Sequence, residues 1–316
     1  MTGTRERVAV VGLGLIGGSL SRRLAASHDV IGYDTDSSTR DLARTAGLTV
    51  VDDLPAAVHE ASIVFVAVAL PALSTVVGQV ALSLPEDAVV TDVGSVKSPL
   101  YAAVRAQGLG TRFVGGHPMA GVERSGFSAS DPDLYDGAAW VLCLEADTVL
   151  ASWLQVAGVL TGMGVRVVPS TAAEHDAAVA RVSHLPHLLA AALAATAADA
   201  GPLALTLAAG SFRDGTRVAS TAPALPTSMC RSNPEAVDAA LGEAMARLQA
   251  AQADPGSLIA AGHQARVAWE NRQAVPSYLP AGDAMLRDRL LELGRRGGWI
   301  ARIGSDVLSV AAPEPV

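Results

Sequence analysis

A glycine-rich turn follows the first apolar run of this chain and constrains its fold most strongly. The run at 8–11 reads Val-Ala-Val-Val, the turn reads Gly-Leu-Gly-Leu-Ile-Gly, and a second apolar run at 30–33 ends on Asp34. This order of strand, glycine turn, helix, strand and acid is the layout of a βαβ unit that binds a dinucleotide. The glycines permit a tight turn, a close approach of backbone to pyrophosphate, and close packing of helix on strand. The predicted cofactor contacts are Gly12, Gly14, Leu15, Ile16, Gly17 and Asp34.

Asp34 also predicts which cofactor binds. A carboxylate at the end of the second strand accepts hydrogen bonds from both ribose hydroxyls of NAD and repels a 2′-phosphate. Its neighbours are Thr35 and Asp36, and the first arginine after it is Arg40. No guanidinium follows directly where a 2′-phosphate would need one, so the sequence favours NAD over NADP.

The composition narrows the class of protein. A length of 316 residues allows two domains. A net charge of −8 argues against a nucleic-acid surface and against an anionic membrane as partners. We expect no membrane span, because the longest apolar helical candidate, 188–198, is short. Two cysteines without metal spacing suit a reducing compartment. The basic and apolar start resembles a signal peptide, but Arg22 and Arg23 stand where a cleavage site is needed, so we expect a cytoplasmic protein.

Valine-rich runs alternate with helical stretches over the first 170 residues, which indicates a mostly parallel sheet covered on both faces. The expected later strands are 63–68, 88–93, 112–116, 139–144 and 165–168. From Thr171 to about Arg295 the periodicity is helical and alanine-rich, and we expect no strand there. The prediction is an α/β fold: a Rossmann-type sheet domain at 1–170, an all-α domain at 171–300, and a tail at 301–316 that is frayed after Val310. Smooth alanine-rich helices are most simply buried between two subunits, so we expect a homodimer.

Two segments at expected strand ends carry reactive groups, and ligands of open α/β sheets bind at that edge. Ser95 lies in Asp-Val-Gly-Ser-Val-Lys and could bond the nicotinamide or a substrate hydroxyl, whereas we expect Lys97 to be structural or an ion-pair partner. His117 follows two glycines and precedes a proline. An imidazole takes up a proton near neutral pH, so His117 is the candidate base.

Two further segments lie in the helical part. His184 and His187 are three residues apart and share a helix face, and Pro186 between them should bend that helix. Together with His175 and His117 they are enough imidazoles to suggest a metal, but no metal-binding spacing accompanies them, so no metal site is predicted. The segment 210–217 places Arg213 and Arg217 on either side of Asp214. Arginine clamps carboxylates with paired hydrogen bonds, and we expect Arg217 to be the one available to a substrate.

The segments GLGLIGGSL, DVGSVK, GGHPMAG, EHD…SHLPH and FRDGTR, in this order, resemble the prephenate/arogenate dehydrogenases of tyrosine biosynthesis. The resemblance covers about Val8 to Gln273. It implies a Rossmann domain followed by a helical dimerisation domain. It also implies NAD-dependent oxidative decarboxylation of prephenate to 4-hydroxyphenylpyruvate, which we favour, or of arogenate to tyrosine. Some 40 residues follow Gln273, too few for the tyrosine-sensing ACT domain of some relatives, and we therefore expect no such regulation.

The resemblance also implies roles for single residues. His117 resembles the base that takes the proton of the ring C4 hydroxyl, and Ser95 the serine beside that base and the nicotinamide. Arg217 matches the arginine that binds a substrate carboxylate, with Asp214 as its neighbour. His187 resembles a histidine that lines the substrate pocket. His175 and His184 are expected to give structural support.

Two other functions are compatible with a glycine turn and a helical second part. A 3-hydroxyacid dehydrogenase would use a lysine of the second domain as its base, but no lysine lies between Ser170 and Met285. A non-catalytic dinucleotide sensor would not require His117 together with two arginines. Both readings are therefore less favoured.

Overall fold

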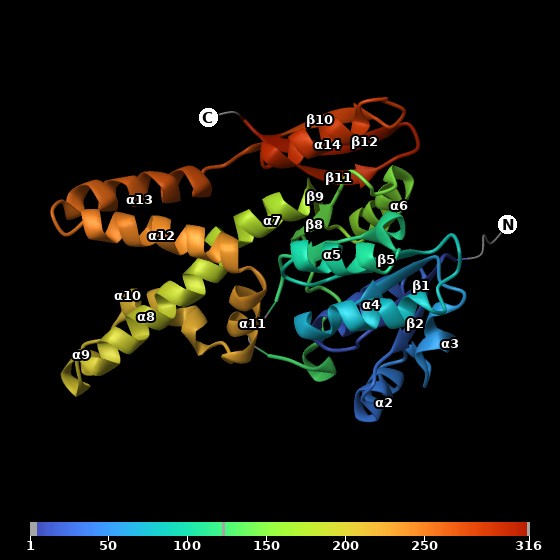
Figure 1. The fold of residues 1–316 in the computed structure, drawn as a ribbon, viewed down its shortest axis with the longest axis horizontal. Helices are drawn as coiled ribbons and strands as arrows, with labels where there is room; N and C mark the ends of the chain where they lie inside the picture. The colour runs from blue at the N-terminus through green and yellow to red at the C-terminus, as the bar shows by residue number, and fades with distance from the viewer. Residues whose placement is uncertain (1–4, 122–123, 315–316) are drawn as a thin grey trace. The chain divides into compact units, whose positions relative to one another are not determined.

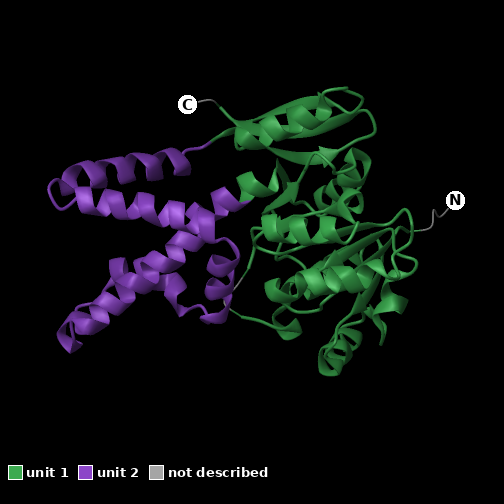
Figure 2. Cartoon of the chain, in the orientation of Figure 1, with its two compact units in different colours: residues 1–175, 273–316 green, residues 176–272 purple. Residues whose placement is uncertain are grey.

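The computed structural model describes residues 5–121 and 124–314, and its elements are labelled in Figure 1. The chain forms two compact units, shown in different colours in Figure 2. Unit 1 comprises Met1–His175 and Gln273–Val316, and unit 2 comprises Asp176–Arg272. The expected helical domain, 171–300, is therefore longer than unit 2 at both ends.

Unit 1 begins with a parallel six-stranded sheet in the order β3-β2-β1-β4-β5-β6. Its strands are β1 (Arg7–Val11), β2 (Asp29–Tyr33), β3 (Thr49–Val50), β4 (Ile63–Val66), β5 (Val89–Asp92) and β6 (Phe113–Val114). The helices between them are α1 (Leu15–Leu24), α2 (Ser37–Thr45), α3 (Leu54–Val58), α4 (Leu73–Ala81) and α5 (Ser98–Ala106), with short 3₁₀ turns η1 (Leu70–Ala72) and η2 (Gly110–Arg112). The predicted parallel sheet is confirmed.

A second six-stranded sheet completes unit 1, in the order β10-β12-β11-β9-β8-β7. Its members are β7 (Gly116–Pro118), β8 (Ala139–Cys143), β9 (Arg166–Ser170), β10 (Ala274–Pro280), β11 (Trp299–Ile303) and β12 (Val307–Pro313). Its accompanying helical segments are η3 (Phe127–Ala129), α6 (Leu150–Gly162) and α14 (Leu286–Arg295). Only β8 and β9 pair in parallel, so this sheet is mostly antiparallel.

The C-terminal part of this second sheet contradicts the sequence-based expectation. We expected no strand before about Arg295 and a frayed end after Val310, but β10 and β12 are paired along seven residues each. Helix α14 packs tightly on β9: a Cβ at Gly294 would lie 1.7 Å from the carbonyl oxygen of Pro169. The segment after Gln273 is therefore a β-α-β-β extension of unit 1.

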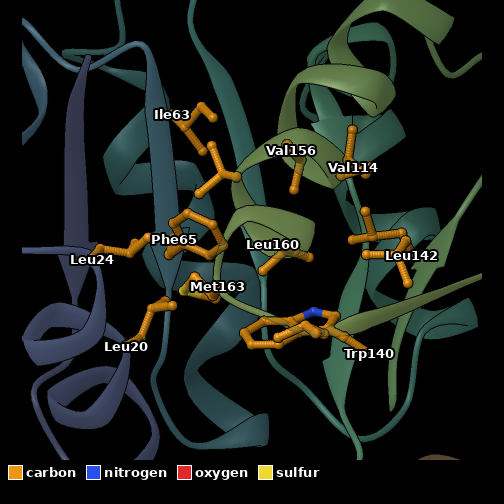
Figure 3. Packing of buried hydrophobic residues seen from close by; sticks show 14 of the residues in the cluster. Leu20, Leu24, Ile63, Phe65, Val114, Trp140, Leu142, Val156, Leu160 and Met163 are labelled. Atoms are coloured by element: carbon orange, nitrogen blue, oxygen red, sulfur yellow. The ribbon is translucent and has the colours of Figure 1, made fainter. Parts of the chain in front are cut away.

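Alternate residues of the central strands enter two different cores. On β1, Val8 and Val10 join one buried cluster and Ala9 and Val11 join the other. Figure 3 shows the first cluster, in which side chains of α1, β4, β8 and α6 meet. Because both sheet faces are buried, the central strands β1 and β4 are apolar at nearly every position, which is why the sequence predicted them well.

Unit 2 is helical. It contains the last part of α7 (Ala172–Val179), a π-helical turn η4 (Ala180–His184), α8 (Leu185–Asp199), α9 (Pro202–Thr206), α10 (Gly210–Thr216), the 3₁₀ turn η5 (Arg217–Ser220), α11 (Ala224–Ser232), α12 (Pro234–Ala250) and α13 (Pro255–Glu270). Its own buried cluster is small, with Ala180, Val237 and Ala240 at its centre. Many large apolar side chains of this unit are exposed, among them Leu203, Leu207, Ile259 and Trp269.

One continuous helical run extends from Ala172 to Asp199. Pro186 was expected to bend it, and the run continues as a π turn directly before that proline, where the missing N–H interrupts the regular hydrogen bonds. The run has 28 residues and is apolar enough, by length and composition alone, to cross a membrane. Our expectation that no segment would be long enough is wrong, because the helix continues through Pro186. Core helices of soluble proteins share this length and composition, so the run by itself does not indicate a membrane protein.

Candidate active site

The predicted nucleotide turn adopts the geometry that its glycines require. Gly12 has φ +95°, and a Cβ there would lie 2.5 Å from the carbonyl oxygen of Ala67. A Cβ at Gly17 would lie 1.8 Å from the carbonyl oxygen of Gly12, so α1 could not pack against the turn with any larger residue. The first and third glycines therefore have the steric roles expected from the sequence.

Gly14 has a different role. It is the N-cap of α1 and provides no side-chain cap, and among the described residues no atom beyond its own chain neighbours lies within 4 Å of where its Cβ would be. Leu15 and Ile16 begin the helix beside it. The backbone N–H groups of a helix start favour an anion such as a pyrophosphate, and the open space allows one to approach.

Asp34 lies at the end of β2 beside this turn. Its Oδ2 accepts a hydrogen bond of 2.7 Å from the amide of Leu13, and its Oδ1 accepts one of 2.9 Å from the amide of Asp36. A carboxylate has about four acceptor positions, so two remain for ribose hydroxyls. Arg40 donates to the carbonyl oxygen of Asp34 at 2.8 Å and to Asp52 at 3.1 Å. Its guanidinium is thus already bonded within the protein, which disfavours its use for a 2′-phosphate.

A cavity of about 450 Å³ adjoins Asp34. Apolar side chains from several elements line it, including Leu54, Val68 and Val76. Gly12, Asp52 and Asp53 add polar edges. An apolar slot next to a ribose-binding acid suits the adenosine end of a dinucleotide, because the base is flat and largely apolar on its faces.

A buried ion pair holds together the two loops that carry Ser95 and His117. Asp92, the last residue of β5, and Lys97 are both fully buried and form this ion pair. The other donors to Asp92 are the amides of Gly94, at 2.7 Å, and Gly116, at 3.1 Å. Lys97 also donates to the carbonyl oxygen of Gly116 at 2.7 Å. The pair therefore fixes the residue before Ser95 and the residue before His117.

The glycines before His117 are required by close contacts. A Cβ at Gly115 would lie 2.7 Å from the Tyr101 ring, and one at Gly116 would lie 2.6 Å from the carbonyl oxygen of Asp92. His117 itself lies on β7 and is half-buried. Burial raises the pKa of Tyr101 well above its ordinary value. Its hydroxyl therefore stays protonated and neutral. The Nδ1 atom of His117 lies 2.9 Å from Nε2 of His175.

The predicted substrate residues Arg217, Asp214 and His187 belong to unit 2. Asp214 lies on α10 and Arg217 begins η5, and both are exposed. His187, on α8, bonds the carbonyl oxygen of Ser183 at 2.8 Å and lines a cavity of about 420 Å³ together with Arg231. The predicted joint action of Arg217 and His117 stays a prediction.

Sequence reasoning expected Lys97 to be structural or an ion-pair partner, and its buried pair with Asp92 agrees with that expectation. Two other features were missed. The direct contact of His175 with His117 joins residues 58 positions apart, and no local sequence pattern predicts such a contact. Asn233, buried in unit 2, donates to the carbonyl oxygen of Asp176 at 2.8 Å and gave no sequence signal at all.

The fold and the turn define unit 1 as a dinucleotide-binding domain of the Rossmann type with a histidine at the carboxyl edge of its strands. The model of the nucleotide-binding domain of prephenate dehydrogenase matches residues 16–169, and that of its dimerization domain matches residues 171–254. The chain belongs to the prephenate dehydrogenase family, as the resemblance predicted.

Individual relatives agree with this. A prephenate dehydrogenase of Lactococcus lactis is 33% identical over 242 residues, 73% of this chain and 66% of that protein. The chain thus spans slightly less than two thirds of this relative. A structure from Corynebacterium glutamicum, assigned to the prephenate dehydrogenases, is 37% identical with a TM-score of 0.85 and covers 95% of this chain and 98% of its own.

Two further solved structures are similar. The Synechocystis arogenate dehydrogenase is 31% identical with a TM-score of 0.74, over 84% of this chain and 99% of that one. The prephenate dehydrogenase of A. aeolicus in complex with hydroxyphenyl propionate and NAD+ is 26% identical with a TM-score of 0.76, over 84% of this chain and 98% of that one.

Proposed function

We propose that the protein is a prephenate dehydrogenase, which converts prephenate to 4-hydroxyphenylpyruvate and CO2 with reduction of NAD. The observation that carries the proposal is the site of unit 1, where a dinucleotide turn with an acid at its second strand accompanies a histidine held at the strand edge. The A. aeolicus relative, whose structure contains NAD+, supports the choice of cofactor.

The reaction balances around two atoms of the substrate ring. Bound NAD would accept the hydride from C4. His117 takes the proton of the C4 hydroxyl as that hydride leaves. The bond between C1 and the ring carboxylate then breaks, its electron pair makes the ring aromatic, and CO2 departs. His117 returns its proton to the new phenolate oxygen, so the enzyme ends unchanged.

The remaining predicted residues position the substrate. Ser95 would bond the reacting hydroxyl or the nicotinamide, and Arg217 would hold a substrate carboxylate with Asp214 and His187 beside it. Because aromatisation drives the loss of CO2, the protein mainly needs to align donor and acceptor, and such alignment supplies several kcal/mol of barrier lowering. General-base help typically adds ~10²–10⁴-fold.

Formation of NADH from prephenate, followed by absorbance, tests the proposal. We expect turnover with NAD and little with NADP. His117→Asn should lower kcat by about 10²-fold or more while NAD affinity persists. The matched control is His59→Asn, because His59 is exposed on the surface of unit 1 and should leave kcat unchanged. Unchanged turnover in His117→Asn would overturn the assignment of the base.

Arogenate dehydrogenase is the second candidate, and the Synechocystis structure favours keeping it. Arogenate carries an ammonium where prephenate carries a keto group, and an ammonium is best bound by a carboxylate. Asp214 or Asp176 could supply one. The same assay with arogenate in place of prephenate decides between them, because the compound with the higher kcat/KM is the substrate.

We further infer that unit 2 forms a homodimer. Helix α13 has no buried residue, and large apolar side chains on α8, α9, α12 and α13 are exposed. So many exposed large apolar side chains in one unit favour a protein interface there. The matched family model describes this region as a dimerization domain. Light scattering at micromolar concentration should give twice the chain mass, and a stable monomer would contradict the inference.

The cellular context follows from the same function. We infer a cytoplasmic enzyme whose partner is a small molecule, and no partnership with nucleic acid or membrane. The net charge of −8 supports the first exclusion. Fractionation of cells should therefore recover the protein with the supernatant, and recovery with membranes would contradict this.

A further inference from the structure

A pair of histidines lies at the proposed catalytic base. His117 Nδ1 and His175 Nε2 are 2.9 Å apart, and the two rings are nearly perpendicular, at 81°. His175 is only 2% exposed. Both residues belong to unit 1, so this contact lies within one compact body.

The first turn of α7 holds His175 in place. Thr171 and Glu174 form a reciprocal capping box: Thr171 donates its amide and hydroxyl to Glu174 at 3.1 and 2.8 Å, and the amide of Glu174 donates to the Thr171 hydroxyl at 3.2 Å. Arg295 from α14 donates to Glu174 at 2.7 Å. The amide of His175 donates to the carbonyl oxygen of Thr171 at 2.9 Å. The backbone that carries His175 is therefore fixed from several sides.

Strand β7 holds the other ring. His117 pairs with Val141 of β8, and the preceding Gly116 is clamped by Asp92 and Lys97. Neither backbone has to move for the two imidazoles to meet. Their contact is therefore determined by the fold of unit 1.

A hydrogen bond between two neutral imidazole nitrogens contains one proton, and its position decides what His117 is able to do. If His175 donates, Nδ1 of His117 is the acceptor and its Nε2 carries the proton, so His117 cannot act as a base at Nε2. If His117 donates from Nδ1, its Nε2 has a lone pair and can take up a proton. Only the second arrangement suits the proposed reaction.

We propose that His175 is a positioning residue that accepts the Nδ1–H hydrogen bond of His117 and so keeps Nε2 of His117 in the basic tautomer. After His117 takes up the substrate proton, the same bond joins the imidazolium to a neutral acceptor and stabilises the charge. This inference rests on the proposed function, and it gives His175 a chemical role beyond the structural support expected from the sequence.

The first test reads the tautomer in the unmodified protein and uses a variant only to assign signals. The chain has seven histidines, so ¹⁵N labelling of imidazoles gives a tractable NMR spectrum, and His117→Asn identifies the signals of His117. At a pH where His117 is neutral, we expect its Nδ1 to be protonated and its Nε2 to be unprotonated. A His117 protonated mainly at Nε2 would overturn the proposal, whatever the activity of any variant.

The second test compares two substitutions. His175→Leu removes the acceptor and should lower kcat about 10–100-fold, the usual cost of removing the group that orients a functional histidine. KM for the substrate should change little. His175→Gln, whose amide oxygen can reach the position of Nε2, should restore much of kcat and the Nδ1–H signature of His117. His59→Leu is the surface control.

The outcomes separate this inference from the proposed function. If the unmodified protein forms no NADH, the proposed function is refuted. The tautomer of His117, measured by NMR, would then still decide whether His175 accepts its Nδ1–H hydrogen bond. A protein that turns over normally while His175→Leu keeps both kcat and the His117 signature would refute the positioning role alone. Equal losses of kcat in the Leu and Gln variants, with lowered unfolding midpoints in both, would make His175 purely structural and refute it as well.

Discussion

Removal of the buried charge of Lys97 should destabilise unit 1 strongly. In Lys97→Met the apolar stem is retained and the ammonium is lost, which leaves Asp92 fully buried without its cation. Breaking a buried pair in this way typically costs 3–5 kcal/mol. The amides of Gly94 and Gly116 still donate to the carboxylate, so the lower end, about 3 kcal/mol, applies. This corresponds to about a hundredfold rise in the unfolded-to-folded ratio.

Urea unfolding followed by tryptophan fluorescence measures this loss, because Trp140 and Trp153 are fully buried in unit 1. With a slope of about 1–3 kcal/mol per molar urea, the midpoint should fall by about 1 M or more. The kcat for NADH formation should fall as well, since a displacement of about 1 Å near a reacting group can cost 10²-fold.

A double variant tests the reasoning itself. Asp92→Asn/Lys97→Met has no buried charge left at this position, so it should be more stable than Lys97→Met alone. Two losses that simply add would show that the partners are not coupled. An unchanged midpoint in Lys97→Met would refute the claim that the pair holds these loops together.

Three shorter predictions concern the cofactor turn and the surface. Gly17→Ala places a methyl group against the Gly12 carbonyl, so NAD affinity should fall tenfold or more in a fluorescence titration. Asp34→Asn should raise the NADP-to-NAD ratio of kcat/KM by about tenfold, because loss of a charged hydrogen bond costs ~1.5–3 kcal/mol. Arg105 holds the pKa of Asp147 below its ordinary 3.8, so this pair stabilises above that value and its contribution is lost as the pH falls through the lowered pKa. The stability gap between the unmodified protein and Arg105→Gln, within about 1 kcal/mol for so exposed a pair, should therefore be constant near neutral pH and close only as the pH falls below the ordinary value of 3.8 and through the lowered pKa.

Each of these has a matched control. Gly158→Ala lies on α6 with nothing within 4 Å of the new methyl group and should bind NAD normally. Asp41→Asn removes an exposed acid of α2 and should leave the NADP-to-NAD ratio unchanged. Arg166→Gln removes an exposed arginine that contacts the carbonyl oxygen of Gly137 and the ring of Trp299, and it should not reproduce the pH effect of Arg105→Gln. A control that behaves like its test variant would contradict the specific cause given above.

The sequence predicted the parallel sheet well for a physical reason. A strand buried on both faces is apolar at most positions, and a turn that approaches a helix closely has to be glycine, so each leaves a local pattern. The runs that became β1 and β4 and the positions Gly12 and Gly17 are of this kind.

The strands of the C-terminal extension left no such pattern. β10 is an edge strand, most of its residues are exposed, and it contains Pro276 and Pro280, which usually argue against a strand. The two prolines are four residues apart, so their backbone nitrogens face the same side of the strand. This is expected if that side is the unpaired edge, where no N–H group is needed. The His117–His175 contact was equally hidden, because only the completed tertiary structure brings these residues together.

The interior position of Lys97 has a practical consequence. It is the only lysine of the chain, and every other residue of its charge type is arginine. Acylating reagents that attack ε-amino groups therefore find a single target, sealed inside unit 1 and reachable only when the region around Asp92 opens. The rate of acylation, measured by mass spectrometry, would report how often the structure around Lys97 opens locally, without any engineered label.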